Sequence, residues 1–343
     1  MNIQQNVSLQ AFNTFGIDVL ARFFTEVCST QDLAAVLQHL RQYPQSLLIL
    51  GGGSNMLFTQ DFDGLVLKNS LKGIDLVKEE RDKVFIKVAA GENWHQFVLW
   101  CIEKNFAGVE NLSLIPGCVG AAPMQNIGAY GVELKDVFYE LEAMEIATGV
   151  SRTFSNEECR FGYRESVFKK EFKNQFIITS VTFRLHNLNV SDHYVYHIDY
   201  GDIKAGLAEN SVFDLNIRAV SDAVIKIRSS KLPDPKELGN SGSFFKNPVI
   251  SNEQFALLQQ SNPLIPSYPA GADKTKVPAG WLIEQCGWKG KRVGNTGSHA
   301  KQALVLVNYG NASGSEVKAL ATAIQQSVMD KFGIEIEAEV NIY

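Results

Sequence analysis

Apolar residues recur at helical spacing in several stretches of the chain. Residues 31–42 place apolar side chains on one helical face, with Ser29 or Thr30 available as the cap. A stretch that begins at Trp94 has the same spacing. Another runs from about residue 315 to 332 and ends at Gly333, the residue type that most often terminates a helix. Each of these stretches predicts an amphipathic helix with one buried face.

Three further helices are expected in the second half of the chain. Residues 280–286 are closed by Gly287, and Ser251 with Gln254 forms a capping box that opens another helix. A helical pattern starts around 216–221, where Ser221 is the expected cap. It stops at "KLPDP" (231–235), because two prolines forbid its continuation. We place the main domain boundary near this segment.

Runs typical of β-strands lie between these helices, at 46–50, 64–68, 84–90, 139–147, 175–185 and 303–308. The final residues, 334–342, alternate strictly between apolar and polar side chains, which predicts one more strand. Its core-facing residues would be Ile334, Ile336, Ala338, Val340 and Ile342. Its outward residues would be Glu335, Glu337, Glu339 and Asn341. Mixed elements without an internal repeat indicate an α+β protein.

Two stretches of small residues interrupt these elements. "GGGSN" (51–55) follows the strand at 46–50, and its backbone N–H groups suit either a phosphate nest or a tight turn. It lacks the Gly-Lys-Ser/Thr of a Walker loop and the last glycine of the dinucleotide fingerprint. Residues 114–131 are rich in glycine, alanine, proline and amides and have no usable period, as in a functional loop. Two such loops suit a ligand with two phosphates.

Composition and charge exclude several classes of protein. The formal net charge of −5 and the absence of a lysine-arginine run argue against nucleic-acid and membrane-surface binding. Neither a signal peptide nor an apolar stretch of spanning length is present, so we expect a cytoplasmic protein. The 5 cysteines are scattered without a C-x-x-C pair, and the 6 histidines give no metal-site spacing that we would rely on. We therefore expect neither disulfides nor a metal.

Ser243 lies in "GNSGSFFKNP" (239–248), between Gly242 and the paired residues Phe244 and Phe245. Its hydroxyl is either a local backbone cap or a reactive group that the phenylalanines hold in a dry place. The local sequence does not decide between these alternatives.

Several motifs together resemble one known family. They are "NTFGI" (13–17), "ILGGGSNML" (49–57), "IPGCVGAAPMQNIGAYG" (115–131), "FGYRES" (161–166), "KLPDP", "GNSGSFFKNP" and "AGWLIEQCG" (279–287). In this order and spacing they resemble the UDP-N-acetylenolpyruvoylglucosamine reductases, the MurB family of peptidoglycan precursor synthesis. The resemblance covers essentially the whole chain. The tyrosine-bearing segment 187–203 resembles the type I branch, in which a tyrosine loop closes over the substrate.

The resemblance implies a two-lobed FAD-binding domain of the vanillyl-alcohol-oxidase (PCMH) type, followed by an α+β substrate-binding domain. The lobes would be residues 1–70 and 71–218, and the substrate-binding domain would be 219–343. It also implies an NADPH-dependent oxidoreductase, UDP-N-acetylmuramate dehydrogenase, with non-covalent FAD and NADPH as co-substrate. We expect a monomer. The residues implied in FAD binding are Gly51, Gly52, Gly53, Ser54, Asn55, Met56, Leu57, Pro116, Gly117, Gly120, Ala121, Pro123, Asn126, Gly128, Ala129 and Tyr130.

The same resemblance implies the catalytic residues Arg164, Ser243 and Glu339. Hydride addition to an enol ether conjugated to a carboxylate leaves a carbanion that must be stabilised and then protonated. Arg164 would supply the permanent positive charge, and Ser243 the proton. The alternating pattern cannot choose among Glu335, Glu337 and Glu339, and only the family match points to the third. Substrate contacts are implied for Tyr130, Tyr200, Lys231, Asn247, Tyr268, Lys289 and Gln302.

Two other functions fit part of the sequence. A flavin oxidase of the same wider fold would need neither the serine acid nor the tyrosines for a diphosphate. A nucleotide-sugar binding protein without activity would not need Arg164, Ser243 and Glu339 together. The family's arginine after the catalytic glutamate is replaced by Asn341 here, so no basic contact is expected at that position.

Overall fold

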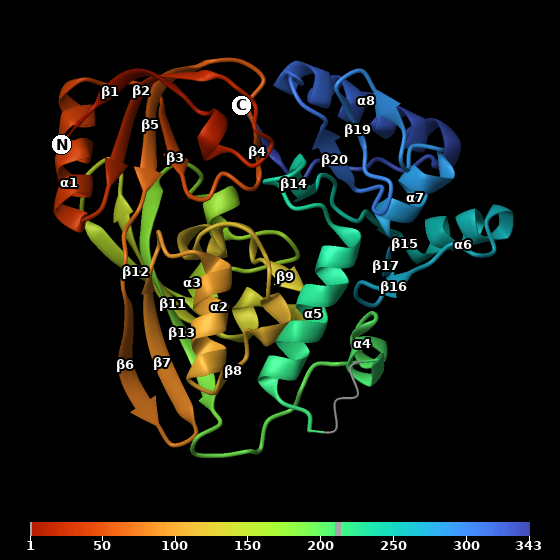
Figure 1. Cartoon of the computed structure of the whole chain (residues 1–343), viewed down its shortest axis with the longest axis horizontal. Coiled ribbons are helices and arrows are strands. Elements are labelled where there is room, and N and C mark those ends of the chain that lie inside the picture. The colour runs from red at the N-terminus through yellow and green to blue at the C-terminus, as the bar shows by residue number, and fades with distance from the viewer. Residues whose placement is uncertain (1, 210–213) are drawn as a thin grey trace. The chain divides into compact units, whose positions relative to one another are not determined.

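The computed structural model describes residues 2–209 and 214–343, which form two compact units (Figure 1). The first unit contains Met1–Val7, Ala21–Gly52 and Asp63–Ser230. The second contains Ser8–Leu20, Gly53–Phe62 and Lys231–Tyr343. The boundary expected at 218/219 thus lies inside helix α5 (Ile217–Lys231), of which only the last residue belongs to the second unit. The subdivision of the flavin domain into lobes 1–70 and 71–218 stays a prediction.

An antiparallel sheet forms the larger layer of the first unit, with strand order β12-β11-β13-β7-β6 and with β8 paired to β13. Its strands are β6 (Ile74–Glu80), β7 (Lys83–Ala89), β8 (Phe106–Ala107), β11 (Phe138–Glu145), β12 (Ser151–Ser155) and β13 (Phe176–Asn187). The longest strand, β13, pairs with β11 on one side and with β7 on the other. This central place agrees with its nearly continuous burial.

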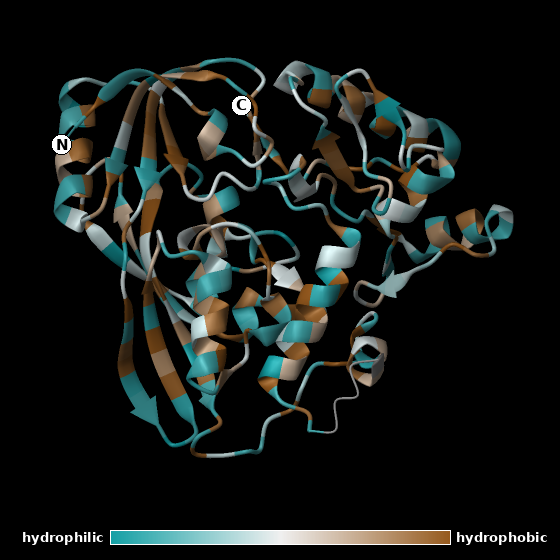
Figure 2. Cartoon of the chain, viewed as in Figure 1, coloured by the Kyte–Doolittle hydropathy of each residue, from teal (hydrophilic) through white to brown (hydrophobic). Residues whose placement is uncertain are grey.

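Helix α2 (Trp94–Glu103) covers one face of this sheet, as Figure 1 shows. Asn93 caps the helix by accepting a hydrogen bond from Gln96 N. The predicted apolar face is confirmed: Trp94, Phe97, Val98, Cys101 and Ile102 are all buried in one cluster with β7 and β13. In Figure 2 the helix is banded with brown and teal, as expected for a half-buried helix.

A second sheet of the first unit has the order β1-β2-β5-β3. Its strands are β1 (Gln4–Ser8), β2 (Leu20–Val27), β3 (Leu47–Leu50) and β5 (Phe62–Asn69). Helix α1 (Thr30–Gln42) buries its predicted apolar face against this sheet. Ser29 is the cap, since its hydroxyl accepts from Asp32 N at 3.1 Å. β3 pairs in parallel with β5, and the chain leaves β3 directly into "GGGSN".

The remaining helices of the first unit are α3 (Asn156–Cys159), α4 (Ile203–Glu209) and α5. The expected cap of α5 at Ser221 is wrong. The helix begins at Ile217, and Asn216 caps it by accepting from Ala219 N at 2.9 Å. Ser221 lies one turn inside, where its buried hydroxyl meets the Ser113 hydroxyl at 2.8 Å. An amphipathic pattern does not show whether a serine lies inside the helix or caps its first turn, so it could not exclude Ser221 as the cap.

The second unit contains a sheet of order β14-β20-β19-β18 and a smaller one of order β15-β17-β16. The strands of the first are β14 (Gly239–Ser243), β18 (Arg292–Val293), β19 (Thr296–Ser298) and β20 (Val305–Asn308). Those of the second are β15 (Val249–Ser251), β16 (Tyr268–Pro269) and β17 (Lys274–Lys276). All of these pairs are antiparallel.

Helices α6 (Asn252–Ser261), α7 (Ala279–Gln285) and α8 (Gly314–Phe332) complete the second unit. The predicted end of α8 is confirmed, because Gly333 follows it with φ 62°. Ser251 caps α6 as expected, accepting from Gln254 N at 3.1 Å. Gln254 does not complete the capping box, since its side chain donates to Gly333 O at 3.3 Å.

The predicted strand at 334–342 is wrong in its length. Only β21 (Asn341–Ile342) is a strand, paired in parallel with β4 (Met56–Leu57), and Ala338 makes an isolated bridge with Phe245. Ile334, Ile336 and Val340 are buried as expected, but Ile342 is 38% exposed. Different parts of the segment therefore pair with different neighbours, Ala338 with Phe245 and β21 with β4, and no single strand of the described part of the chain accompanies it.

Candidate active site

The first glycine loop leaves β3 and makes a close backbone contact with the second. A Cβ at Gly52 would lie 2.7 Å from the Cα of Gly117, a distance that real Cβ atoms do not show. Lys68 donates a hydrogen bond to the carbonyl oxygen of Gly51. Gly51 itself has room, because its Cβ would lie 3.7 Å from the Cβ of Cys118. The structure thus brings the two predicted loops together, with Gly51 half-buried beside Cys118.

The second half of the first loop belongs to the other unit, since the division falls between Gly52 and Gly53. There a Cβ at Gly53 would lie 1.9 Å from the carbonyl oxygen of Phe12, and Gly53 has φ 64°. Thr14 N donates to Gly53 O at 3.1 Å. This contact holds the predicted motif "NTFGI" directly against "GGGSN".

The second loop is built from tight turns. Its turns are the 3-10 helices η3 (Val119–Ala121) and η4 (Pro123–Gln125), and β9 (Gly128–Ala129) and β10 (Val132–Glu133) follow as a hairpin. Gly120 N donates to Ala90 O at 2.9 Å, and a Cβ at Gly120 would lie 2.4 Å from the Cβ of Ala90. Glycine at 120 therefore lets the loop rest directly on the end of β7. Short turns of this kind explain why the segment shows no helix or strand period.

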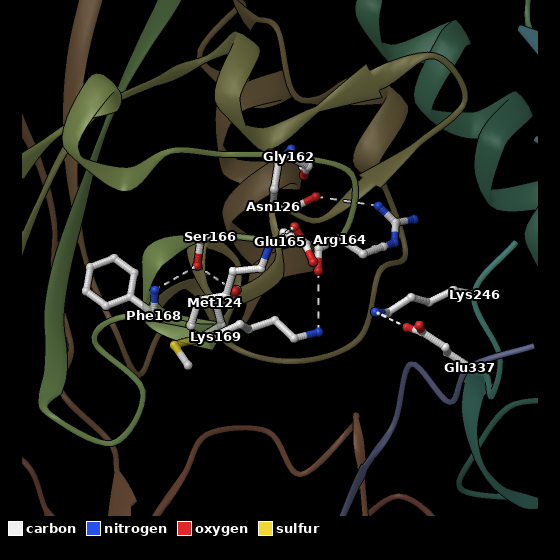
Figure 3. A network of polar contacts seen from close by, with 11 residues as sticks. Met124, Asn126, Gly162, Arg164, Glu165, Ser166, Phe168, Lys169, Lys246 and Glu337 are labelled. Carbon is white, nitrogen blue, oxygen red and sulfur yellow. Dashed lines mark hydrogen bonds and ion pairs between the residues drawn. The ribbon is translucent and has the colours of Figure 1, made fainter. Parts of the chain in front are cut away.

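Asn126 connects this loop to the "FGYRES" turn (Figure 3). It is fully buried in the left-handed conformation, with φ 45°. Its Nδ2 donates to Gly162 O at 3.0 Å and to Glu133 Oε2 at 3.1 Å, and its Oδ1 accepts from Lys135 N at 3.0 Å. Asn126, predicted as a flavin residue, thus fixes the backbone of the loop and the position of the neighbouring turn.

Arg164 projects from that turn onto the second loop. Its Nη2 donates to Gly128 O at 2.7 Å and its Nη1 to Asn126 O at 3.5 Å, as Figure 3 shows for Asn126. Its φ of 56° lies in the left-handed region that a side chain rarely adopts. The turn is held further by Ser166, whose hydroxyl donates to Met124 O at 2.7 Å. The guanidinium is therefore fixed in position at a cost in local backbone strain.

Tyr130 and Tyr200, both predicted to contact the substrate, are neighbours within the first unit. A Cβ at Gly131 would lie 3.4 Å from the Cβ of Tyr200, and one at Gly201 would lie 3.8 Å from the ring of Tyr130. Tyr130 has φ 51°. Segment 187–203 therefore meets the end of the second glycine loop.

Arg228 of α5 is a polar residue that the sequence analysis missed. Its Nε is buried and has no hydrogen-bond partner among the described residues. Burial, the largest cause, and the positive charge of Arg164 lower the pKa of Arg228, which still remains charged. Two neighbouring guanidiniums favour an anionic ligand. The only signal in the sequence is its place on the helix, three residues before Lys231.

In the second unit, Ser243 ends β14 just after a bulge. Gly242 has φ 70°, and its N–H donates to Asn240 Oδ1 at 2.9 Å. Phe244 and Phe245 are 0% and 1% exposed, with ring centroids 5.1 Å apart, whereas Ser243 is exposed. The expectation that the phenylalanines enclose the serine is wrong. Both rings lie in the core, so they anchor the chain directly after the serine and leave its side chain exposed.

Glu339 is held beside the same strand by its backbone. Its N–H donates to Phe244 O at 2.8 Å, and its carbonyl oxygen accepts from Asn55 Nδ2 at 3.2 Å. It is half-buried, whereas Glu335 and Glu337 are exposed and Glu337 pairs with Lys246 at 3.1 Å (Figure 3). Glu339 therefore differs from the other two glutamates in burial, and its catalytic role stays a prediction.

The other predicted substrate residues of the second unit lie at several places. Asn247 and Gln302 meet the start of α7: Asn247 Oδ1 accepts from Ala279 N at 3.0 Å, and a Cβ at Gly280 would lie 3.0 Å from Gln302 Oε1. Lys289 lies beyond the other end of α7 and pairs with Glu284 at 2.9 Å. Tyr268 lies on the edge strand β16, 42% exposed. Lys231 is the last residue of α5.

Both units match models of known families. Residues 234–343 match the model described as "UDP-N-acetylenolpyruvoylglucosamine reductase, C-terminal domain", and residues 21–155 match an FAD binding domain. A UDP-N-acetylenolpyruvoylglucosamine reductase of Flavobacterium johnsoniae is 52% identical over 100% of both chains. This chain belongs to the UDP-N-acetylenolpyruvoylglucosamine reductase family. A Pseudomonas putida reductase is 47% identical over 99% of this chain and 98% of its own.

The reductase fold is also seen in a solved structure. The enzyme from Thermus caldophilus covers 100% of this chain and 99% of its own, with a TM-score of 0.69 at 21% identity. The predicted fold class, an FAD-binding domain followed by the C-terminal domain of this reductase family, is thereby confirmed. In the part of the chain that the structure describes, no helix has both the length and the apolar character needed to span a membrane.

Cys118 is the one cysteine that lies in a glycine loop of this reductase. Burial, the largest cause, raises the pKa of its thiol, against the opposing effect of Lys68 and Lys72. A thiol that stays protonated is a poor nucleophile. Its side chain packs beside Gly51, as the contact of a Cβ built there shows.

Proposed function

We propose that the chain is the UDP-N-acetylenolpyruvoylglucosamine reductase of its organism. It would reduce the enolpyruvyl ether of the UDP-sugar to the lactyl ether of UDP-N-acetylmuramate, with NADPH as the electron donor. The observation that carries this proposal is the 52% identity with a reductase over the full length of both chains. Identity over the full length matters, because the residues proposed for the reaction are spread along the whole chain.

FAD would bind along the two glycine loops. When bound, it would take hydride from NADPH and supply it to the enolpyruvyl carbon. Residues 51–57 and the predicted residues between Pro116 and Tyr130 would hold its diphosphate and ring through backbone N–H groups. The absence of a side chain at Gly51 and the Gly52–Gly117 contact fit such a cradle. The raised pKa of Cys118 supports non-covalent binding.

Arg164 would stabilise the charge that develops next to the substrate carboxylate. Its position is fixed before substrate arrives by the bonds to Gly128 and Asn126. A preorganised donor of this kind is worth about 3–4 kcal/mol of transition-state stabilisation. The unpartnered Nε of Arg228 makes it a second candidate donor to an anionic group.

Ser243 would donate the proton to the carbanion, and Glu339 would support that transfer. A carbanion is a strong enough base to take a proton from a hydroxyl that is aimed at it. The bulge at Gly242 and the buried phenylalanines hold the backbone on both sides of the serine, and the Glu339 backbone is bonded to Phe244. The half-buried state of Glu339 supports its choice over Glu335 and Glu337.

The UDP diphosphate and sugar would be bound by polar side chains. Phenol, amide and ammonium groups are apt donors to phosphate oxygens. The residues proposed for these contacts are Tyr130, Tyr200, Lys231, Asn247, Tyr268, Lys289 and Gln302.

An anaerobic two-step experiment tests the function. The flavin of the purified protein is reduced with NADPH, and the enolpyruvyl UDP-sugar is then added. We expect the yellow of oxidised flavin to return in proportion to the sugar added. Steady hydrogen peroxide formation with an alcohol and without nicotinamide would indicate a flavin oxidase. A colourless protein that takes up no FAD would indicate a binding protein.

A further inference from the structure

Segment 187–203 carries Tyr200 and belongs to the first unit. Hydrogen bonds to other parts of that unit hold it in place, and the proposed function does not use the residues that make them. Its start is fixed where Leu188 N donates to Asn105 O at 2.9 Å and Asn189 Nδ2 donates to Lys104 O at 2.8 Å. In Figure 1 the chain leaves β13 and continues past β8 to α4. What holds the middle of the segment is a pair of consecutive buried polar residues.

Glu110 and Asn111 lie in the 3-10 helix η2 (Glu110–Leu112), and both are 1% exposed. Glu110 Oε1 accepts from the hydroxyl of Tyr194 at 2.6 Å, and its Oε2 accepts from Gly108 N at 2.7 Å. A buried carboxylate is costly unless it is hydrogen-bonded, so the phenol of Tyr194 stabilises both groups. Burial first, and Glu110 second, raise the pKa of Tyr194, which therefore stays a donor.

Asn111 makes the second attachment. The two hydrogens of its Nδ2 go to His197 O at 2.6 Å and to Tyr130 O at 3.0 Å. One amide therefore connects the tyrosine segment to the end of the second glycine loop. The reverse orientation of the amide would set its oxygen against two carbonyl oxygens, so the contacts define the side chain's orientation. Its Oδ1 is buried and has no partner among the described residues.

The two attachments leave Tyr200 at the end of a fixed stretch. Beyond His197, Ile198 packs against the α4–α5 cluster, and Tyr200 then lies against Gly131. Glu110 and Asn111 therefore hold the segment three residues apart, at Tyr194 and His197. The ring of Tyr194 also packs on His186 and on Tyr196, with centroids 5.6 and 5.0 Å apart.

We infer that Glu110 and Asn111 are positioning residues that dock segment 187–203 and thereby place Tyr200 for the UDP-sugar. The inference rests on the proposed function for its ligand. The dock itself, which consists of the Glu110–Tyr194 and Asn111–His197 hydrogen bonds, does not depend on that function. Neither residue would touch substrate. They would keep the segment ordered before the UDP-sugar arrives. Binding would then not have to offset the conformational entropy lost when the segment becomes ordered.

The test compares Tyr194→Phe with Tyr196→Phe in the FAD-loaded chain. Both remove one phenol hydroxyl from neighbouring rings, but only Tyr194 bonds to Glu110. Hydrogen exchange measured by mass spectrometry on peptides covering 188–200 should become faster in Tyr194→Phe and stay unchanged in Tyr196→Phe. Asn111→Asp, which cannot donate to the two carbonyls, should accelerate the same peptides. Unchanged exchange in both Tyr194→Phe and Asn111→Asp would overturn the dock.

Kinetics tests the positioning. In Tyr194→Phe the KM for the UDP-sugar should rise about tenfold, the change that one lost hydrogen bond typically causes, while NADPH reduces the flavin at the wild-type rate. Tyr196→Phe should change neither. Faster exchange with an unchanged KM would overturn the positioning of Tyr200. If the wild-type protein does not turn over the UDP-sugar at all, the proposed function fails. The hydrogen-exchange result would still show whether Glu110 and Asn111 hold segment 187–203.

Discussion

The backbone N–H of Glu339 donates a hydrogen bond to the carbonyl oxygen of Phe244, with 2.8 Å between the two atoms. This bond places the glutamate next to the strand end that carries Ser243, although almost a hundred residues separate them in sequence. The backbone of each residue is held in place, Glu339 by this bond and Ser243 by the pairing of β14 with β20.

Ser243→Ala should separate the two half-reactions. Reduction of flavin by NADPH should be nearly unchanged, while reoxidation by the UDP-sugar should slow by about 10²- to 10⁴-fold, because the proton donor is gone. Stopped-flow absorbance under anaerobic conditions measures both steps. Equal slowing of the two steps would contradict the role of Ser243.

Ser241→Ala is a matched control two residues away. The hydroxyl of Ser241 is buried without a partner among the described residues, and the side chain is 8% exposed. Removing an unsatisfied polar group should leave the free energy of unfolding unchanged or raise it by about 1 kcal/mol. Urea unfolding measures this, and both half-reactions should keep their rates. A loss of stability would show that the hydroxyl has a partner, such as an ordered water.

Glu339→Gln and Glu337→Gln should differ in the rate of flavin reoxidation, although the two positions are only two residues apart. Glu337 is an exposed partner of Lys246, so its change should alter stability by less than about 1 kcal/mol and leave turnover intact. Glu339→Gln should slow the reoxidation of flavin by about 10²-fold or more. If Glu337→Gln were the slower variant, the choice of glutamate would be wrong.

The glycine loops give a prediction on flavin binding. Gly52→Ala brings a Cβ to 2.7 Å from Gly117, so the flavin-free protein should lose about 1–3 kcal/mol of unfolding free energy. Gly51→Ala makes only an ordinary contact at 3.7 Å, so the flavin-free protein should keep its stability and bind FAD more weakly. Urea unfolding and flavin fluorescence titration measure the two effects. A Gly51→Ala protein with wild-type affinity would place the flavin elsewhere.

His95 should make the unfolding free energy depend on pH. Its Nδ1 accepts from Leu114 N at 3.0 Å, and burial, with a smaller effect of Arg228, lowers its pKa from 6.5. Below pH 6.5 the unfolded chain takes up the proton first, so this contribution to stability is present above 6.5 and is lost as the pH falls through the lower folded pKa. The slope for one group is at most about 1.4 kcal/mol per pH unit.

His95→Asn, which retains an acceptor near the position of Nδ1, should reduce that slope. Urea unfolding from about pH 7.5 to about pH 5.5 compares it with the wild type. His193→Gln is the control, because its side chain is 95% exposed. An unchanged slope in His95→Asn, or an equal reduction in His193→Gln, would contradict the assignment.

The sequence predicted the helices with a clear apolar face well. The face of α1 and that of α2 are buried residue for residue as expected, because one face of each meets one sheet. Residues 334–342 show the limit. Their alternation reports burial correctly at Ile334 and Ile336, but burial does not specify which backbone pairs with the segment.

The candidate site was predictable where a motif marks it and not where tertiary contacts create it. Arg164 was found from "FGYRES", whereas Arg228 is distinguished only by an Nε that becomes buried without a partner. Ser243 was found, but its surroundings were not, because the two phenylalanines that follow it are buried in the core while the serine itself is exposed. Ser221 was misjudged since Asn216, five residues earlier, offers the better cap.

The second unit draws on three stretches of the chain, which bears on its biosynthesis. Asn240 N donates to Thr14 O at 2.9 Å, Asn308 Nδ2 donates to Phe15 O at 2.9 Å, and the ring of Phe15 lies 6.3 Å from that of Phe244. On the ribosome, residues 8–20 emerge long before these partners exist. These contacts of residues 8–20 cannot all form until Asn308 has been translated. A fragment that starts at Lys231 would lack them and should aggregate when expressed alone.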